Sequence, residues 1–410
     1  MGLKQINRKY KSGFLAQVDA SIRGEITSIP VGLNRVGTVF NLLQYRYTLI
    51  SGATGSGKTS FTDYLFILSV WRYLKNNPEN IYWETIYFSL ERKEMFKHAK
   101  WLSWFIYKDH KHIVSADELM GWGQSPVNTT GYNLIRSYDD EMTALLERVK
   151  IYDGKFSPKA VSEIITTKAF SLGTFYHTDN IGLYIQGELL PSMLFSDLNL
   201  IENTPTGPEK YLDLMHNGES FRLYTNDHKY FMTNPKSFIF IVIDGINLIG
   251  DKTIIDTISI ELANARDLYG FSPVVVTQQN RAMGDIQRLK LQADDLSPQL
   301  EDIFKSSQMG FDADLVLGLF DPYRYKAYDA GGKYDGYILK PPVLSVNKHS
   351  MLSPLGQSRF RSIHILKNTF GAEGLKFALK FLGECNHFET LPFPDDILME
   401  NIYAEIKQGI

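Results

Sequence analysis

The sequence has 410 residues, of which 44% are hydrophobic and 22% are charged, as in ordinary globular proteins. The formal net charge of −3 excludes a protein that coats nucleic acid through a global positive charge, but not a motor that holds DNA through a few loops. The single cysteine, Cys385, excludes an internal disulfide framework and a multi-cysteine zinc site. We find no secretory signal and no apolar run long enough to span a membrane. We therefore expect a protein of the cytoplasm, or of a host cytoplasm if the source is viral.

Residues 1–28 are expected to form an N-terminal arm that resembles a linker helix. Its apolar residues Phe14, Leu15, Val18 and Ile22 approximate one face of a short helix. The pattern fits a helix that folds back on its own core as well as an arm that docks on a neighbouring subunit.

A glycine-rich stretch at 52–60 matches the phosphate-loop pattern G-x-x-x-x-G-K-[ST]. The residues before it, 45–50, predict a strand, and the apolar spacing over 61–68 predicts a helix. In this arrangement backbone N–H groups converge on phosphate oxygens. We expect Lys58 to reach the β- and γ-phosphates and the Thr59 hydroxyl to hold Mg²⁺. The predicted ATP-binding residues are Gly52, Thr54, Gly55, Ser56, Gly57, Lys58, Thr59 and Ser60.

Three later stretches are predicted to be strands that end in polar residues. Residues 81–91 end at Glu91, which could orient the water that attacks a γ-phosphate, although a charged residue at a strand end more often begins a solvated helix. Residues 237–244 are a continuous apolar run, typical of a strand covered on both faces, and end in Asp244, a candidate for the Mg²⁺ shell.

The third of these strands spans 272–281 and carries Gln278, which could contact the γ-phosphate or end the strand in solvent. Helical patterns at 157–171 and 253–268 alternate with the strands. This alternation predicts an α/β fold with a mainly parallel central sheet flanked by helices.

The order of these motifs resembles that of DnaB-type replicative helicases. The matching stretches are Ile-Pro-Val-Gly at 29–32, the phosphate loop, Phe-Ser-Leu-Glu at 88–91, Ile-Asp at 243–244, Thr-Gln-Gln-Asn-Arg at 277–281, Asp-Ala-Asp-Leu-Val-Leu at 312–317 and Ile-Leu-Lys-Asn-Thr-Phe-Gly at 365–371. The resemblance implies a RecA-like P-loop NTPase domain over 29–385 with an insertion at about 173–235. It also implies that Glu91 is the catalytic glutamate, Asp244 the acidic metal-site residue and Gln278 the γ-phosphate sensor.

By the same resemblance, the protein is an ATP-dependent motor that translocates on single-stranded DNA as a hexameric ring, with replication or loading proteins as candidate partners. In the family, the loops that follow the glutamine-bearing strand hold the DNA. Here this interval is 281–311, and its DNA-binding candidates are Arg281, Arg288, Lys290 and Lys305. Because acidic residues alternate with them, a solvated loop is the alternative.

The sequence departs from the family at its Lys-x-Arg motif, whose arginine reaches the γ-phosphate of the neighbouring subunit. Here Lys367 is kept, but Thr369 stands at the arginine position. The candidates for a residue that acts in trans are Lys367, Arg359 and Arg361.

The resemblance also differs in domain organisation. We expect no N-terminal collar domain, since only the arm precedes residue 29. In the insertion, 219–231 predicts a β-hairpin around Asn226-Asp227, and we interpret the insertion as a surface elaboration rather than a partner dock. The loop at 321–358 mixes tyrosines with basic residues, which fits base stacking as well as a plain β-loop. Residues 386–410 form a tail that caps the domain or binds a partner.

Two other functions remain open from the sequence. One is a RecA-like DNA-dependent ATPase without unwinding activity, such as a loader, recombination mediator or defence component, and Thr369 favours it. The other is a nucleotide-gated assembly protein that binds ATP mainly for structure.

Overall fold

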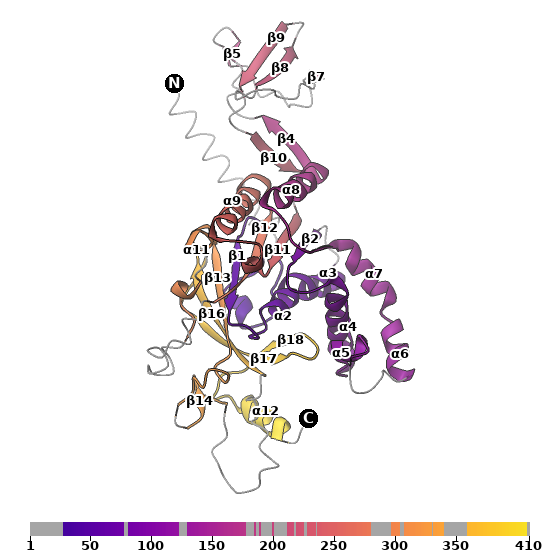
Figure 1. Cartoon of the computed structure of the whole chain (residues 1–410), viewed down its shortest axis with the longest axis vertical. Helices are drawn as coiled ribbons and strands as arrows, with labels where there is room; N and C mark the ends of the chain where they lie inside the picture. The colour runs from indigo at the N-terminus through magenta and orange to yellow at the C-terminus, as the bar shows by residue number, and fades with distance from the viewer. Residues whose placement is uncertain are drawn as a thin grey trace.

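The computed structural model describes residues 28–77, 81–122, 129–177, 184–185, 188–189, 199–200, 211–216, 219–224, 228–234, 236–279, 297–303, 307–329, 331–339 and 359–407. A nine-stranded sheet lies at the centre and helices cover both of its faces (Figure 1). The predicted α/β class is therefore confirmed. Among the described residues, no helix combines the length and the apolar character needed to cross a bilayer.

The strand order of the sheet is β18-β17-β16-β13-β1-β12-β11-β2-β3. Neighbours from β13 to β3 run parallel, whereas β16, β17 and β18 form an antiparallel edge. The strands are β1 (Thr48–Gly52), β2 (Tyr82–Ser89), β3 (Val149–Asp153), β11 (Ser237–Asp244), β12 (Ser272–Gln278), β13 (Leu315–Phe320), β16 (Phe360–Asn368), β17 (Lys376–Leu382) and β18 (His387–Thr390). The sheet thus continues past the domain boundary expected at residue 385.

Helices from two parts of the chain cover the two faces of the sheet. One face carries α2 (Lys58–Asp63), the π-helical turn η2 (Tyr64–Leu68), α3 (Ser69–Asn76), α4 (Glu94–His110) and α7 (Asp139–Arg148). The other carries α8 (Pro158–Leu172), α9 (Lys252–Tyr269) and α11 (Ser307–Asp312). Shorter elements are η1 (Val36–Thr38), α5 (Ala116–Leu119), α6 (Thr129–Arg136), η4 (Ile246–Leu248), η7 (Leu300–Asp302) and α12 (Ile397–Lys407).

Local signals explain where the longer helices begin and end. Ser157 caps α8 by accepting a hydrogen bond from Ala160 N at 3.2 Å, and Asp251 caps α9 through Ile254 N at 3.1 Å. Gly270, with φ of +72°, ends α9 in a left-handed conformation that glycine adopts without steric cost.

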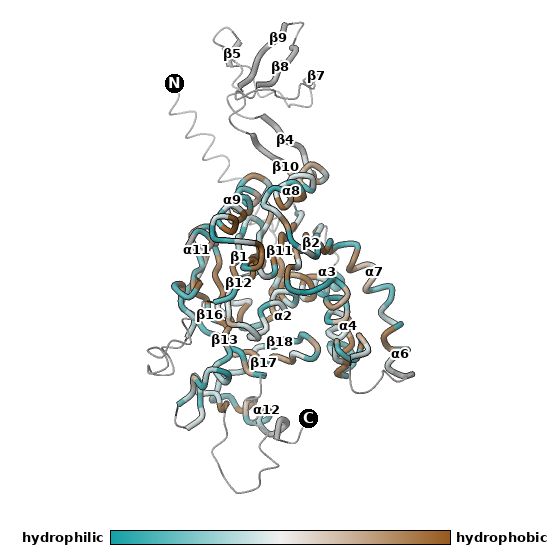
Figure 2. The backbone as a smooth tube through the Cα atoms, viewed as in Figure 1, coloured by the Kyte–Doolittle hydropathy of each residue, from teal (hydrophilic) through white to brown (hydrophobic). Residues whose placement is uncertain are grey.

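The core has two layers because every central strand is buried on both sides. In β11, Phe238, Phe240 and Val242 pack on the α2–α4 side. The alternating Ile239, Ile241 and Ile243 pack on the α8–α9 side. A strand covered on both faces needs an uninterrupted apolar run, as the sequence predicted. Figure 2 shows hydrophobic residues in the strands of the sheet, while hydrophobic and hydrophilic segments alternate along α8 and α9.

The β-hairpin predicted for residues 219–231 is wrong in its pairing. β9 (Glu219–Tyr224) pairs antiparallel with β8 (Tyr211–His216), and β10 (His228–Met232) pairs with β4 (Gly173–His177). The insertion leaves the domain after α8 and returns just before β11, so its two ends lie side by side and form a two-stranded stem. The other strands of the insertion are β5 (Tyr184–Ile185), β6 (Glu188–Leu189) and β7 (Asn199–Leu200).

The C-terminal tail packs on the antiparallel edge of the sheet. Met399 of α12 joins a small core with Phe360 and with Tyr334 and Tyr337, which belong to the short strands β14 (Lys333–Tyr334) and β15 (Tyr337–Ile338). These tyrosines are 2% and 3% exposed, so their rings are not free to stack on bases. The described part of the tyrosine-rich loop therefore supports structure, and the tail caps the domain.

Candidate nucleotide-binding site

The phosphate loop lies at the carboxyl end of β1, in the middle of the sheet. In the strand register Gly52 lies beside Gln278 at the end of β12, and Asp244 at the end of β11 lies beside Ser89 at the end of β2. The sheet therefore brings the loop and the ends of three neighbouring strands to one edge. This edge is where open α/β sheets place their ligands.

The conformation of the loop depends on its glycines. Gly55 and Gly57 have φ angles of +77° and +96°, in the region that residues with a side chain rarely adopt. A Cβ atom on Gly52 would lie 2.6 Å from the carbonyl oxygen of Leu319. Gly57 immediately precedes the helix that begins at Lys58, so the loop ends at a helix N-terminus with free N–H groups.

Lys58 is buried beneath the loop. Its Nζ donates a hydrogen bond to the carbonyl oxygen of Ala53 at 3.0 Å. Burial lowers the pKa of Lys58 to about 8, and the nearby carboxylates of Glu91 and Asp244 partly offset this effect. An anionic phosphate in the loop would restore the charge of this ammonium group.

Thr59 and Asp244 present oxygen atoms suited to Mg²⁺. Thr59 Oγ1 donates to Asp244 Oδ1 at 2.9 Å. A hydroxyl and a carboxylate are hard oxygen ligands, and Mg²⁺ is commonly held by one or two protein oxygens together with substrate phosphates. This donor set fits the predicted metal site. In keeping with such a site, the described residues contain no cluster of three or more His, Cys, Asp or Glu that could hold a metal.

Glu91 and Gln278, predicted as catalytic residue and sensor, are in contact. Gln278 Nε2 lies 3.4 Å from Glu91 Oε1 and donates to it. Glu91 is exposed, so its carboxylate is accessible to water. Behind it lies Gly245, at φ of +90°, where a Cβ atom would approach Glu91 Cγ to 2.8 Å. The glycine that follows Asp244 thus leaves room for the glutamate.

A buried polar network behind Asp244 was not predicted from the sequence. Lys97, 1% exposed, lies 3.2 Å from Asp244 Oδ2 and 3.5 Å from Asp63 Oδ1. Lys97 Nζ also donates to the Tyr87 hydroxyl at 2.6 Å, and Trp101 Nε1 donates to Asp63 Oδ2 at 3.0 Å. Burial raises the pKa of Asp63, and Lys97 opposes that rise.

The sequence did carry a signal for this network. Lys97 occupies the same helical face as Trp101, four residues later, and a lysine on an apolar face needs a buried partner. Asp63 likewise interrupts an apolar helix. Because both oxygens of Asp244 are bonded, through Thr59 on one side and Lys97 on the other, the orientation of this carboxylate is fixed.

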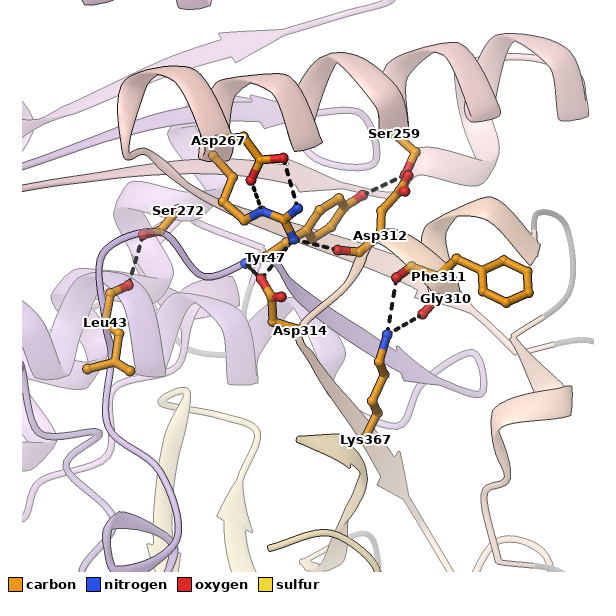
Figure 3. Close-up of polar contacts among 11 residues, drawn as sticks. Leu43, Tyr47, Ser259, Asp267, Ser272, Gly310, Phe311, Asp312, Asp314 and Lys367 are labelled. Atoms are coloured by element: carbon orange, nitrogen blue, oxygen red, sulfur yellow. Dashed lines mark hydrogen bonds and ion pairs between the residues drawn. The ribbon is translucent and has the colours of Figure 1, made fainter. Parts of the chain in front are cut away.

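The residues predicted as trans-acting candidates are all engaged within their own chain. Arg361, 2% exposed, donates through Nε to the carbonyl oxygen of Ser56 at 2.6 Å. Lys367 Nζ donates to the carbonyl oxygens of Gly310 and Phe311 at 3.0 and 3.1 Å, at the end of α11 (Figure 3). Arg359 lies 3.9 Å from Glu384.

The position of the missing family arginine is on the surface at the opposite end of the sheet from the phosphate loop. Thr369 is exposed, and its backbone N–H donates to the carbonyl oxygen of Asp314 at 2.9 Å. Arg266, near the same edge, is paired with Asp267 and Asp314, and the hydrogen bonds to Asp267 raise its pKa. The DNA-binding candidates Arg281, Arg288, Lys290 and Lys305 lie outside the described residues.

Comparison of the sequence with protein-family models and with curated proteins found no match. Among solved structures, the chain is similar to the ATPase domain of a DnaB-like helicase, with a TM-score of 0.56 and 14% identity over 93% of this chain and 98% of that chain. It is also similar to a DnaB-like replicative helicase, whose interactions with primase were described with its structure, at a TM-score of 0.55 and 14% identity. That alignment covers 93% of this chain and 66% of the helicase. The chain therefore has the RecA-like fold of the ATPase domains of DnaB-like replicative helicases.

Proposed function

We propose that the chain is an ATP-hydrolysing motor that translocates on single-stranded DNA as a homo-oligomeric ring, in the manner of a DnaB-type helicase. The observation that carries this proposal is the meeting of four functions at one edge of the sheet. The phosphate loop, Asp244, Glu91 and Gln278 come from neighbouring parallel strands and lie within contact of one another. Phosphate binding, metal binding, water activation and sensing are the functions that a P-loop motor needs.

The residues of the site divide the work of hydrolysis. Lys58 and the loop N–H groups bind the phosphates. Thr59 and Asp244 would hold Mg²⁺, which neutralises the charge that develops on the phosphoryl oxygens. Glu91 orients and deprotonates the attacking water. Since Gln278 donates to Glu91, a change at the γ-phosphate is passed to the end of β12, from which the 281–311 segment continues.

Glu91→Gln tests the catalytic assignment. An amide of the same shape cannot accept a proton, so kcat for ATP hydrolysis should fall about 100-fold or more, while ATP still binds. Glu94→Gln is the matched control, because Glu94 is exposed in the first turn of α4 and lies outside the site. Full ATP hydrolysis and strand separation by Glu91→Gln would contradict the proposal.

A specific observation favours a second function, a RecA-like ATPase that does not unwind DNA. Thr369 replaces the arginine of the family motif, and the side chains of Lys367 and Arg361 are bonded within their own chain. An arginine that acts across a subunit interface can contribute about 10³–10⁵ in rate, so its absence would slow a ring motor severely.

Forked-duplex unwinding, measured beside ATPase activity with and without single-stranded DNA, separates the functions. Unwinding supports the helicase. Stimulation of the ATPase without unwinding supports the second function, as would be found for a loader or recombination mediator. Neither activity, with ATP binding retained, supports a nucleotide-gated assembly protein. Light scattering with and without ATP determines whether a hexamer forms.

A further inference from the structure

Two arginines hold the outer side of the phosphate loop. Arg361 lies in β16 and donates through Nε to the carbonyl oxygen of Ser56 at 2.6 Å. Arg324, in the segment that follows β13, donates through Nη1 to the carbonyl oxygen of Thr54. Its guanidinium covers Gly55 so closely that a Cβ atom there would lie 2.5 Å from Nη1. Both arginines come from the antiparallel side of the loop, since β13 pairs with β16.

Asp321 joins the two arginines into one unit. Its Oδ1 accepts a hydrogen bond from the backbone N–H of Arg324 at 3.2 Å, and its Oδ2 lies 3.2 Å from Arg361 Nη1. Asp321 is 5% exposed and Arg361 is 2% exposed, so the pair is fixed inside the domain. Arg324 extends from this buried anchor to the surface of the loop, where its side chain is exposed.

The planar trans peptide bond gives these contacts a consequence. A carbonyl group and the N–H of the next residue point to opposite sides of their shared peptide plane. Holding the Thr54 carbonyl toward Arg324 therefore turns the N–H of Gly55 to the opposite side. Holding the Ser56 carbonyl toward Arg361 does the same for the N–H of Gly57.

These two N–H groups belong to a loop whose conformation is otherwise weakly determined. Gly55 and Gly57 both have positive φ angles, and glycine has no side chain that favours this conformation over others. Ordering such a loop when a ligand binds costs free energy, and a loop that is already ordered avoids that cost. N–H groups that converge in advance form an anion site.

We infer that Arg324 and Arg361 are positioning residues that pre-organise the phosphate loop of their own subunit for the phosphates of a nucleotide. This assigns Arg361 a role within its own site. The inference rests on nucleotide binding by the proposed motor, but it requires neither DNA nor a ring. Arg324 is the better residue to test, because it is exposed and its replacement leaves the buried pair of Arg361 and Asp321 intact.

The test compares wild type with Arg324→Ala, Arg324→Lys and the control Arg136→Ala. Arg136 is an exposed arginine near the end of α6, paired only weakly with Asp139 at 3.7 Å. Calorimetric titration with ADP gives Kd, steady-state hydrolysis gives KM and kcat for ATP, and thermal melting without nucleotide reports on the fold.

For Arg324→Ala we expect Kd for ADP and KM for ATP to rise together by about tenfold, the loss of one charge-assisted hydrogen bond. The kcat should stay within about twofold of wild type, because the loop is held alike in ground and transition states. The melting temperature without nucleotide should move by no more than about 1 °C. Arg324→Lys should recover part of the affinity, and Arg136→Ala should match wild type.

Two outcomes overturn the inference. A Kd for Arg324→Ala within about twofold of wild type shows that the contact does not order the loop. A fall in kcat at unchanged KM shows that Arg324 acts on the reacting phosphate instead. A wild-type protein that binds no nucleotide at all refutes the proposed function itself, which is a different result.

Discussion

Lys97→Met removes the ammonium group that lies between two buried carboxylates. Lys97 Nζ lies 3.2 Å from Asp244 Oδ2 and 3.5 Å from Asp63 Oδ1, and all three side chains are at most 2% exposed. Methionine has a similar length and is accommodated in apolar surroundings, so the substitution changes the charge more than the packing. The variant must either bury two uncompensated carboxylates or take up a proton.

The geometry sets the size of the effect. At separations of 3.2 and 3.5 Å and an effective dielectric constant of about 20, each attraction amounts to about 5 kcal/mol. The cost of burying the ammonium group offsets much of this sum. Breaking a buried ion pair by removing one partner typically costs about 3–5 kcal/mol, and we expect the free energy of unfolding of Lys97→Met to fall by this amount near pH 8.

Urea denaturation followed by tryptophan fluorescence measures the loss, since Trp101 is bonded to Asp63 and reports on this region. Lys108→Met is the matched control, because Lys108 is exposed in the last turn of the same helix. The control should change the free energy of unfolding by less than about 0.5 kcal/mol.

The pH dependence provides a second check. Burial raises the pKa of Asp63, and removing Lys97 removes an interaction that lowers it. A carboxyl group whose pKa is raised by folding contributes stability that is fully present below its ordinary pKa of about 4 and is lost as pH rises through the folded value. The deficit of Lys97→Met relative to wild type should therefore shrink between about pH 8 and pH 5. A loss no larger than that of Lys108→Met, with no dependence on pH, would refute the reasoning.

Two further predictions concern the nucleotide site. Gly245→Ala is expected to lower kcat for ATP hydrolysis by about tenfold or more with nucleotide affinity retained, because a Cβ atom 2.8 Å from Glu91 Cγ displaces the catalytic carboxylate. Gly154→Ala is its control, since Gly154 also has a positive φ but faces open space, and equal kcat values for the two variants would contradict the prediction. Nucleotide affinity should fall as pH rises through about 8, because burial lowers the pKa of Lys58 to about 8 and the neutral amine no longer attracts phosphate. Calorimetric titrations between about pH 6.5 and 9.5 should show this fall in wild type but not in Lys58→Met, and a parallel dependence in both would argue against Lys58 as its origin.

The sequence by itself determined the fold class and the nucleotide-facing edge of the sheet. The phosphate loop needs glycines at fixed spacing, and the strand at 237–244 needs an unbroken apolar run because both of its faces are covered. Both requirements are local, so they can be read without knowing which strands are neighbours. The carboxyl ends of parallel strands meet at one edge, and this rule brought Asp244 and Gln278 to the phosphate loop.

The tertiary structure decided the partners of side chains that are distant in sequence. Arg361 was expected as a candidate to reach a neighbouring subunit, but its guanidinium contacts Ser56 in its own phosphate loop. This outcome depends on β16 lying beside β13, a pairing that no local pattern specifies. The pairing of β10 with β4 rather than with β9 has the same origin. Residue types and their spacing determine which chemistry is available, whereas strand order and burial determine which atoms meet, because contacts between distant segments form only when the whole chain is packed.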